Sequence, residues 1–167
     1  YKYGFYKGFD VYPSTGGPES SEKILGKNIK TLQNIRAANQ FSFLHTYQVH
    51  SPYTLHPRLP FNQDVFNKYQ KNNLSLSKLT NGPSGLYQPL DEKTKKKIID
   101  YYDAEYEYFD HWFGYFIKEL KNLNVYDQSM IVILSDHGEE FYEHRSWRHG
   151  YSLYNEVLHV PLIIKFP

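Results

Sequence analysis

The 167-residue chain contains no cysteine, and what the sequence lacks excludes several classes of protein. Without cysteine there is no disulfide scaffold, no Cys-ligated zinc site and no Cys nucleophile within these residues. No apolar run approaches the ~18 residues that a membrane-spanning helix needs. Lys and Arg number 19 against 18 Asp and Glu, so no excess of positive charge indicates nucleic acid as a partner.

Aromatic residues are abundant instead, at 18% of the chain with 17 Tyr and 11 Phe. Together with a hydrophobic share of 40%, they supply enough apolar material for a core and exclude global disorder. Because every Tyr carries a hydroxyl, a core rich in Tyr also needs hydrogen-bond partners. The length fits one domain or a large part of one.

The order of apolar and turn-forming segments predicts an α/β fold. Helices are expected over about 21–40 and 92–122, the second with Asp91 as its N-cap. The prolines and glycines of residues 51–92 predict an irregular segment with room for one short helix. Strands are predicted at 41–47, 130–134 and 160–166. The run MIVIL at 130–134 is short, apolar and β-branched, which favours a strand buried on both faces, as in a parallel sheet.

Apolar residues along the second helix recur at three- and four-residue steps, which predicts one buried stripe. A second stripe of carboxylates beside it is predicted to be solvated or paired with lysine, and consists of Asp103, Glu107 and Asp110. The apolar stripe consists of Ile98, Tyr102, Tyr106, Phe109, Phe113, Ile117 and Leu120.

The densest cluster of chemically active side chains follows the strand predicted at 130–134. Asp136 and His137 come directly after it, and His144 and His149 lie in the same segment. Ligands of open α/β sheets bind beyond the carboxyl ends of the strands, so Asp136 and His137 are candidate ligands of a divalent cation. The alternative is a polar surface loop whose histidines are close by chance. The position of the segment directly after a strand favours function.

A second polar cluster follows the strand predicted at 41–47. It contains His45 and His50, and it could face the same crevice. Pro52 restricts Ser51 to extended backbone, which would hold His50 in a defined direction. For His45 we favour a structural role, whereas local evidence leaves a structural and a functional role equally open for His50.

Four motifs resemble the sulfatase branch of the alkaline phosphatase superfamily. The most specific is IVILSDHGEEFYEHRSWRHG at 131–150, followed by HVPLIIKFP at 159–167. Supporting similarity lies in GFD at 8–10, in VHSPY at 49–53 and in the helical segment 101–120. The resemblance implies part of an alkaline-phosphatase-like α/β sandwich with a mainly parallel central sheet and flanking helices.

The resemblance also implies roles for individual residues in a metal-dependent sulfuric ester hydrolase. Asp136 and His137 match a pair of metal ligands, for which Ca²⁺ or Mg²⁺ is expected. His50 matches a histidine that contacts the transferred group and can protonate the leaving oxygen, and His149 matches a Lys or His that touches the sulfate. His144 matches a common histidine for which we expect a structural role. The implied partner is a sulfated small molecule or glycan, and family members commonly act outside the cytoplasm.

Two parts of the family's site have no counterpart in this sequence. Sulfatases use a Cys or Ser, converted to formylglycine, in a C/S-x-P-x-R motif, and an Asp-Asp pair supplies further metal ligands. Neither motif occurs here, and in the family both precede the GFD segment. We therefore expect residues 1–167 to be the C-terminal portion of a sulfatase-like catalytic domain that starts in mid-domain, lacks the upstream nucleophile segment and is inactive in isolation.

Two alternatives stay open. Phosphoethanolamine and phosphoglycerol transferases of the same superfamily share the Asp-His-Gly motif, but use a Thr nucleophile and usually Zn²⁺ or Mn²⁺. The GFD segment and the helix at 101–120 favour a sulfatase. A non-catalytic relative that binds a sulfated or phosphorylated glycan is the second alternative, against which the intact Asp136-His137 pair, His50 and His149 argue. The sequence leaves the oligomeric state open.

Overall fold

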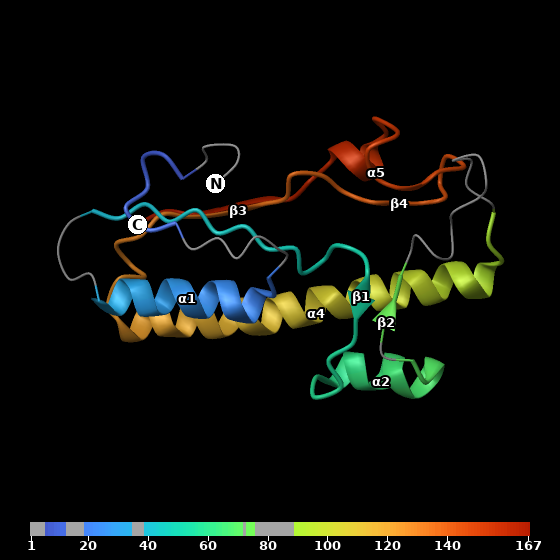
Figure 1. The fold of residues 1–167 in the computed structure, drawn as a ribbon, viewed down its shortest axis with the longest axis horizontal. Helices are drawn as coiled ribbons and strands as arrows, with labels where there is room; N and C mark the ends of the chain where they lie inside the picture. Colours follow the sequence, from blue (N-terminus) through green and yellow to red (C-terminus); the bar gives the residue numbers. More distant parts are fainter. Residues whose placement is uncertain (1–5, 13–18, 35–38, 72, 76–88) are drawn as a thin grey trace.

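The structure, a computed structural model, describes residues 6–12, 19–34, 39–71, 73–75 and 89–167. Helices and short strands are mixed, and α1 lies alongside the long helix α4 (Figure 1). The elements are α1 (Ser21–Asn34), β1 (Tyr53–Thr54), α2 (Pro60–Tyr69), β2 (Asn73–Leu74), α4 (Glu92–Asn122), β3 (Ile131–Leu134), β4 (Glu140–Phe141), β5 (Trp147–Arg148), α5 (Asn155–Leu158) and β6 (Leu162–Lys165).

Local sequence signals place the two main helices correctly. Asp91 is the N-cap of α4, and its carboxylate accepts hydrogen bonds from the backbone N–H and the hydroxyl of Thr94 at 2.9 and 2.7 Å. The helix predicted over 21–40 is present as α1, although α1 is shorter than expected. No helix in the described part of the chain is both long and apolar enough to cross a bilayer.

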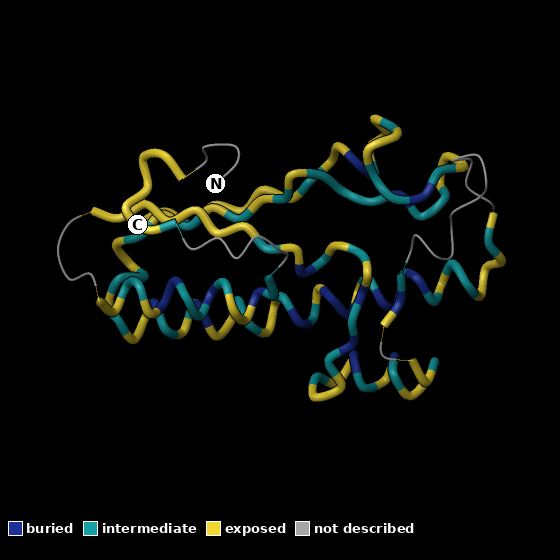
Figure 2. Tube along the Cα trace, in the orientation of Figure 1, coloured by how far each residue is buried: buried dark blue, intermediate teal, exposed yellow. Residues whose placement is uncertain are grey.

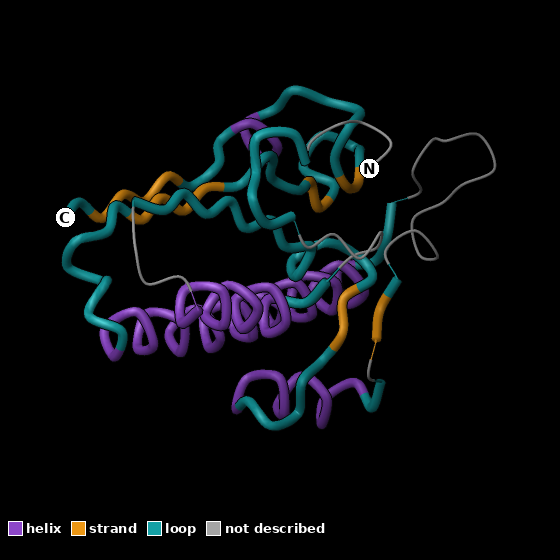
Figure 3. Tube along the Cα trace, turned by 60° about the vertical axis from the view of Figure 1, so that its left-hand side comes forward, coloured by secondary structure: helices purple, strands orange, loops and turns teal. Residues whose placement is uncertain are grey.

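Two apolar clusters flank α4 along its length. One joins the N-terminal half of α4 to α2, β1, β2 and β5, and consists of Tyr53, Leu55, Val65, Leu74, Ile98, Tyr101, Ala104 and Trp147. The other joins its C-terminal half to α1, and consists of Leu25, Ile29, Phe116 and Leu120. Helix α4 is therefore the common support for both ends of the fold, as Figure 3 shows from a second direction.

The buried face of α4 differs from the predicted stripe. Ile98 and Leu120 are buried as predicted, but Tyr106 is 45% exposed, whereas Tyr101 and Ala104 are fully buried. Aromatic residues occupy several sides of this helix, so periodicity alone does not select the inward side. Packing against α1, α2 and β1 selects it.

The carboxylate stripe of α4 is also not uniformly solvated. Asp103 and Asp110 are exposed, but Glu107 accepts hydrogen bonds from the backbone N–H groups of Phe61 and Asn62 at 3.0 and 2.9 Å. The expectation of a solvated or lysine-paired group is therefore wrong for Glu107. These N–H groups lie at the start of α2, where the first turn has no partners of its own.

Strands β3 and β6 form an antiparallel ribbon in which Ile131 lies opposite Lys165. The expectation of a strand buried on both faces is wrong, because Val132 and Leu134 are 47% and 61% exposed (Figure 2). Only the inner face packs, through Ile131, against the α1–α4 cluster. All three strand pairs in the described residues are antiparallel, so a mainly parallel central sheet stays a prediction.

The strand predicted at 41–47 is absent, since these residues pair with no other described strand. Phe41 and Phe43 are 78% and 71% exposed. A short run bounded by turn-forming residues is not sufficient for a strand, because its backbone N–H and C=O groups also need a neighbouring strand. The short helix allowed within 51–92 is α2.

Candidate active site

The segment that follows β3 folds back on itself as a short hairpin. Strands β4 and β5 pair antiparallel, and the N–H of Tyr142 donates to the carbonyl of Ser146 at 2.9 Å. The side chain of Trp147 is fully buried in the core, which anchors the hairpin. This anchor places His149 just after β5, facing His137 from the loop before β4.

A buried carboxylate orients His149. The Nδ1 atom of His149 lies 3.0 Å from a carboxylate oxygen of Glu139, whose side chain is only 6% exposed. The hydroxyl of Tyr53 donates to the other oxygen of Glu139 at 3.4 Å. Burial, followed by the charge of Glu139, raises the pKa of Tyr53, so this hydroxyl keeps its proton. Glu139 therefore fixes the direction of the His149 ring.

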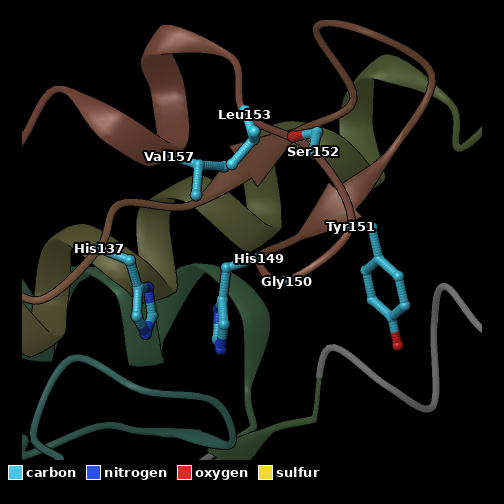
Figure 4. A pocket seen from close by; sticks show the side chains of 7 residues that line it. All are labelled: His137, His149, Gly150, Tyr151, Ser152, Leu153 and Val157. Carbon is cyan, nitrogen blue, oxygen red and sulfur yellow. The ribbon is translucent and has the colours of Figure 1, made fainter.

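The rings of His137 and His149 stack with their centroids 3.8 Å apart. They line a pocket of about 380 Å³ whose other walls come from residues 150–153 and Val157. Figure 4 shows the two imidazoles side by side and pointing in the same direction, with the Tyr151 ring to one side of them. Ring nitrogen atoms of both His137 and His149 therefore line the same pocket.

His50 reaches the same cluster from the segment between α1 and β1. Its ring meets the His149 ring edge-on, with centroids 5.3 Å apart. Its Nδ1 atom lies 2.6 Å from the carbonyl oxygen of Ser51. The peptide bond between Ser51 and Pro52 is cis.

The three imidazoles share one hydrogen-bonding pattern. In His137, Nδ1 lies 2.8 Å from the carbonyl oxygen of Gly138. A carbonyl oxygen only accepts hydrogen bonds, so the Nδ1 atoms of His50 and His137 carry the proton, and the carboxylate of Glu139 imposes the same on His149. Each Nε2 atom is then available as a ligand to a metal ion or as an acceptor of a proton, and once it is protonated it can donate to a substrate oxygen.

Comparison with known proteins identifies the family to which this site belongs. The sequence model of the sulfatase family matches residues 2–167. The chain belongs to the sulfatase family. Among its relatives are iduronate 2-sulfatase of Homo sapiens, 33% identical over 81 residues, and arylsulfatase K of Bos taurus, 36% identical over 76 residues. The endo-4-O-sulfatase of Bacteroides thetaiotaomicron is 30% identical over 73 residues.

These matches cover 48%, 46% and 44% of this sulfatase-family chain, respectively. They cover 14% of each relative's own length, so the chain spans a small part of these proteins. Membership of the family implies the α/β fold of the alkaline phosphatase superfamily, and the mixture of helices and strands agrees with it.

The carboxylate of Asp136 and the imidazole of His137 are suitable ligands for a divalent cation, but two ligands do not make a complete site. A carboxylate oxygen of Asp136 lies 3.8 Å from Nε2 of His137, and the Asp136 side chain is 70% exposed. The Nδ1–H of His137 is held by the Gly138 carbonyl, which is the usual outer contact of a ligating imidazole. The described residues contain no group of three or more ligands arranged around one point, so this pair is an incomplete site.

Other histidines of the described chain lie outside this cluster. His144 stacks on Tyr154 with centroids 3.6 Å apart and contacts Glu156 at 3.2 Å, contacts that agree with the expected structural role. His56 stacks on Tyr108, and burial lowers its pKa.

Two functional candidates escaped the sequence analysis. Glu139 directly follows the Asp-His-Gly triplet, which could have indicated it, but only its contact with His149 reveals the role. Glu105 lies in the segment that resembles a family helix and gave no separate signal. It is 2% exposed and accepts hydrogen bonds from the side-chain amide of Gln48 and the backbone N–H of Thr54.

Changing Gly138 to alanine is expected to lower the free energy of unfolding by about 2 kcal/mol. A Cβ atom on Gly138 would lie 2.0 Å from the backbone oxygen of Glu156, and relieving this overlap would break the 2.8 Å hydrogen bond from the Gly138 N–H to the Val157 carbonyl. Urea unfolding measures the change. Gly114→Ala is the matched control, because nothing lies within 4 Å of its Cβ position. Equal stability of the two variants would contradict the prediction.

Proposed function

We propose that the chain is the C-terminal portion of the catalytic domain of a metal-dependent sulfuric ester hydrolase. The observation that carries the proposal is the convergence of His50, His137 and His149, each with its Nδ1 proton held by an oxygen. Membership of the sulfatase family supports the reaction class.

In this proposal the imidazoles act on the oxygens of the sulfate ester. When both of its ring nitrogens carry protons, His149 donates from Nε2 to a sulfate oxygen, while Glu139 holds the Nδ1 side of the ring. His50 delivers a proton to the leaving oxygen when the ester bond breaks. Asp136 and His137 would be ligands of a Ca²⁺ or Mg²⁺ ion. Such an ion, when bound, neutralises charge on the oxygens of the ester.

The metal pair without further described ligands and the exposed ribbon support the proposal that further protein completes the domain. Val132, Leu134, Leu162 and Ile163 of β3 and β6 are 47–64% exposed, and both outer edges of the ribbon lack a partner among the described strands. Exposed apolar strands of this kind are usually covered by another part of a protein. We propose that the covering part carries the nucleophile, the remaining metal ligands and the rest of a mainly parallel sheet.

For the substrate we propose a sulfated small molecule or glycan. The name of one relative, iduronate 2-sulfatase, supports a sulfated sugar. We also propose that the protein acts outside the cytoplasm, because sulfatase-family members commonly do. Which sugar is bound would depend on residues beyond this cluster.

The proposal is tested by producing the chain together with the rest of its catalytic domain and assaying hydrolysis of an aryl sulfate with and without EDTA. We expect turnover that EDTA abolishes and that His149→Ala strongly reduces. His111→Ala is the control, because His111 lies on the exposed side of α4 against Trp112. Turnover of a phosphoethanolamine ester with Zn²⁺ or Mn²⁺ instead would favour a transferase, and glycan binding without turnover would favour a non-catalytic relative.

The isolated 167-residue chain is expected to hydrolyse no sulfate ester. Its sequence has no C/S-x-P-x-R motif to supply the nucleophile, and the residues that the structure describes form no closed metal site. The measurement is an aryl sulfatase assay of the purified chain with Ca²⁺ or Mg²⁺. Metal-dependent turnover by this chain would contradict the prediction.

A further inference from the structure

Glu105 is a buried carboxylate without a cationic partner in the described structure. It is 2% exposed, and it makes no ion pair with a described residue. Its two oxygens accept hydrogen bonds from different places: Oε2 from the side-chain amide of Gln48, and Oε1 from the backbone N–H of Thr54. Burying an acidic group is costly, and an apolar residue would fill this position more cheaply if packing were its only purpose.

The two donors stand at the two ends of the segment that carries His50. Gln48 precedes His50, is 8% exposed and also accepts a hydrogen bond from the N–H of Ser21 at 3.1 Å, which joins it to the start of α1. Thr54 follows the fully buried Tyr53 in β1. One carboxylate on α4 therefore holds both ends of residues 49–53.

His50 itself has few contacts that would fix its direction. Its side chain is exposed, and among the described residues its ring meets the rings of Tyr47 and His149 and the Ser51 carbonyl. Because packing does not hold this ring, its position against His149 depends on the backbone that carries it.

We propose that Glu105 is a positioning residue, which holds residues 49–53 so that the His50 ring stays against the His149 ring. Its effect on the loop stands by itself, and only its consequence for ester turnover rests on the proposed function. Glu105 touches neither imidazole and acts entirely through the two ends of the segment.

The obvious variant, Glu105→Gln, leaves one donor without an acceptor. The new amide oxygen can still accept from Thr54, but its NH₂ group then faces the NH₂ group of Gln48. Turning the Gln48 amide over would only move the mismatch to the N–H of Ser21. The double variant Gln48→Glu with Glu105→Gln restores every pairing. The amide introduced at position 105 would donate to the carboxylate introduced at position 48, whose other oxygen accepts from Ser21. An unmatched buried donor therefore weakens the attachment of residues 49–53 to α4.

The experiment measures amide hydrogen exchange and ring–ring NOEs on the 167-residue chain at pH 8, where Glu105 is ionised because its pKa is about 7. We expect Glu105→Gln to speed exchange at residues 49–54 by about tenfold or more and to remove the NOE between His50 and His149. The double variant is expected to restore both signals. Glu107→Gln is the matched control: its carboxylate binds the N–H groups of Phe61 and Asn62, so exchange should rise there and not at 49–54.

Unchanged exchange at 49–54 in Glu105→Gln would overturn the proposal. Exchange that rises equally over α4 and residues 49–54, without rescue by the double variant, would also overturn it, because this would be general destabilisation. In the complete domain, Glu105→Gln should lower kcat for sulfate ester hydrolysis, with recovery in the double variant. If the loop behaves as expected but the unmodified complete domain hydrolyses no sulfate ester, the proposed function fails while the positioning role stands.

Discussion

Replacing Trp147 by alanine is expected to lower the free energy of unfolding by roughly 3–5 kcal/mol. Trp147 is fully buried in the cluster that joins β5 to α4, α2 and β1, and it also packs on the ring of Tyr142. Removing the indole loses its burial and leaves a cavity beside fully buried Tyr53 and Tyr101. Unfolding by urea, followed by circular dichroism, measures the change.

The Trp147→Ala substitution should also disturb the candidate active site. His149 lies two residues after Trp147, so the cavity would loosen the end of the hairpin that presents its ring. Trp112→Ala is the matched control, because Trp112 is only partly buried in the α1–α4 cluster and far along the chain from the hairpin. A smaller loss for Trp147→Ala than for Trp112→Ala would contradict the burial argument.

Between about pH 4.5 and 7, the free energy of unfolding is expected to fall by about 3 kcal/mol through Glu105. Burial raises the pKa of Glu105 from 4.5 to about 7, and the hydrogen bonds from Thr54 and Gln48 offset only part of this. The folded chain thus binds this proton more tightly than the unfolded chain. The resulting stability is complete below pH 4.5 and is lost as the pH rises through 7.

Other carboxyl groups make the free energy of unfolding rise with pH. The contribution of Glu105 must therefore be measured as the difference between the unmodified chain and a variant without this carboxyl group. Hydrogen bonds lower the pKa of Asp91, and those from Lys68, Tyr69 and Lys96 lower that of Asp100 against its partial burial. Urea unfolding of the unmodified chain and of Glu105→Gln should be compared at several pH values, because these contributions cancel between the two. The excess stability of the unmodified chain should decline from pH 4.5 to 7. Parallel stability curves would show that Glu105 does not titrate in this range.

Short-range signals predicted the features that depend on neighbouring residues. Asp91 caps α4 because Thr94 lies three residues later, and α1 begins at Ser21, where the helix predicted over about 21–40 starts. Asp136, His137 and His149 could be recognised together because one segment contains them. The family resemblance arises from the same segment, and the family model confirms it.

Tertiary structure alone decided which distant groups meet. The sequence left the role of His50 open and did not single out Glu139 or Glu105, yet packing on α4 brings His50 against His149 and both ends of its segment to Glu105. The strand predicted at 41–47 is absent for the same reason, because a strand needs a partner strand as well as a suitable short run of residues. Capping and periodicity act within a few residues, whereas contacts between distant segments depend on how the helices and strands pack together.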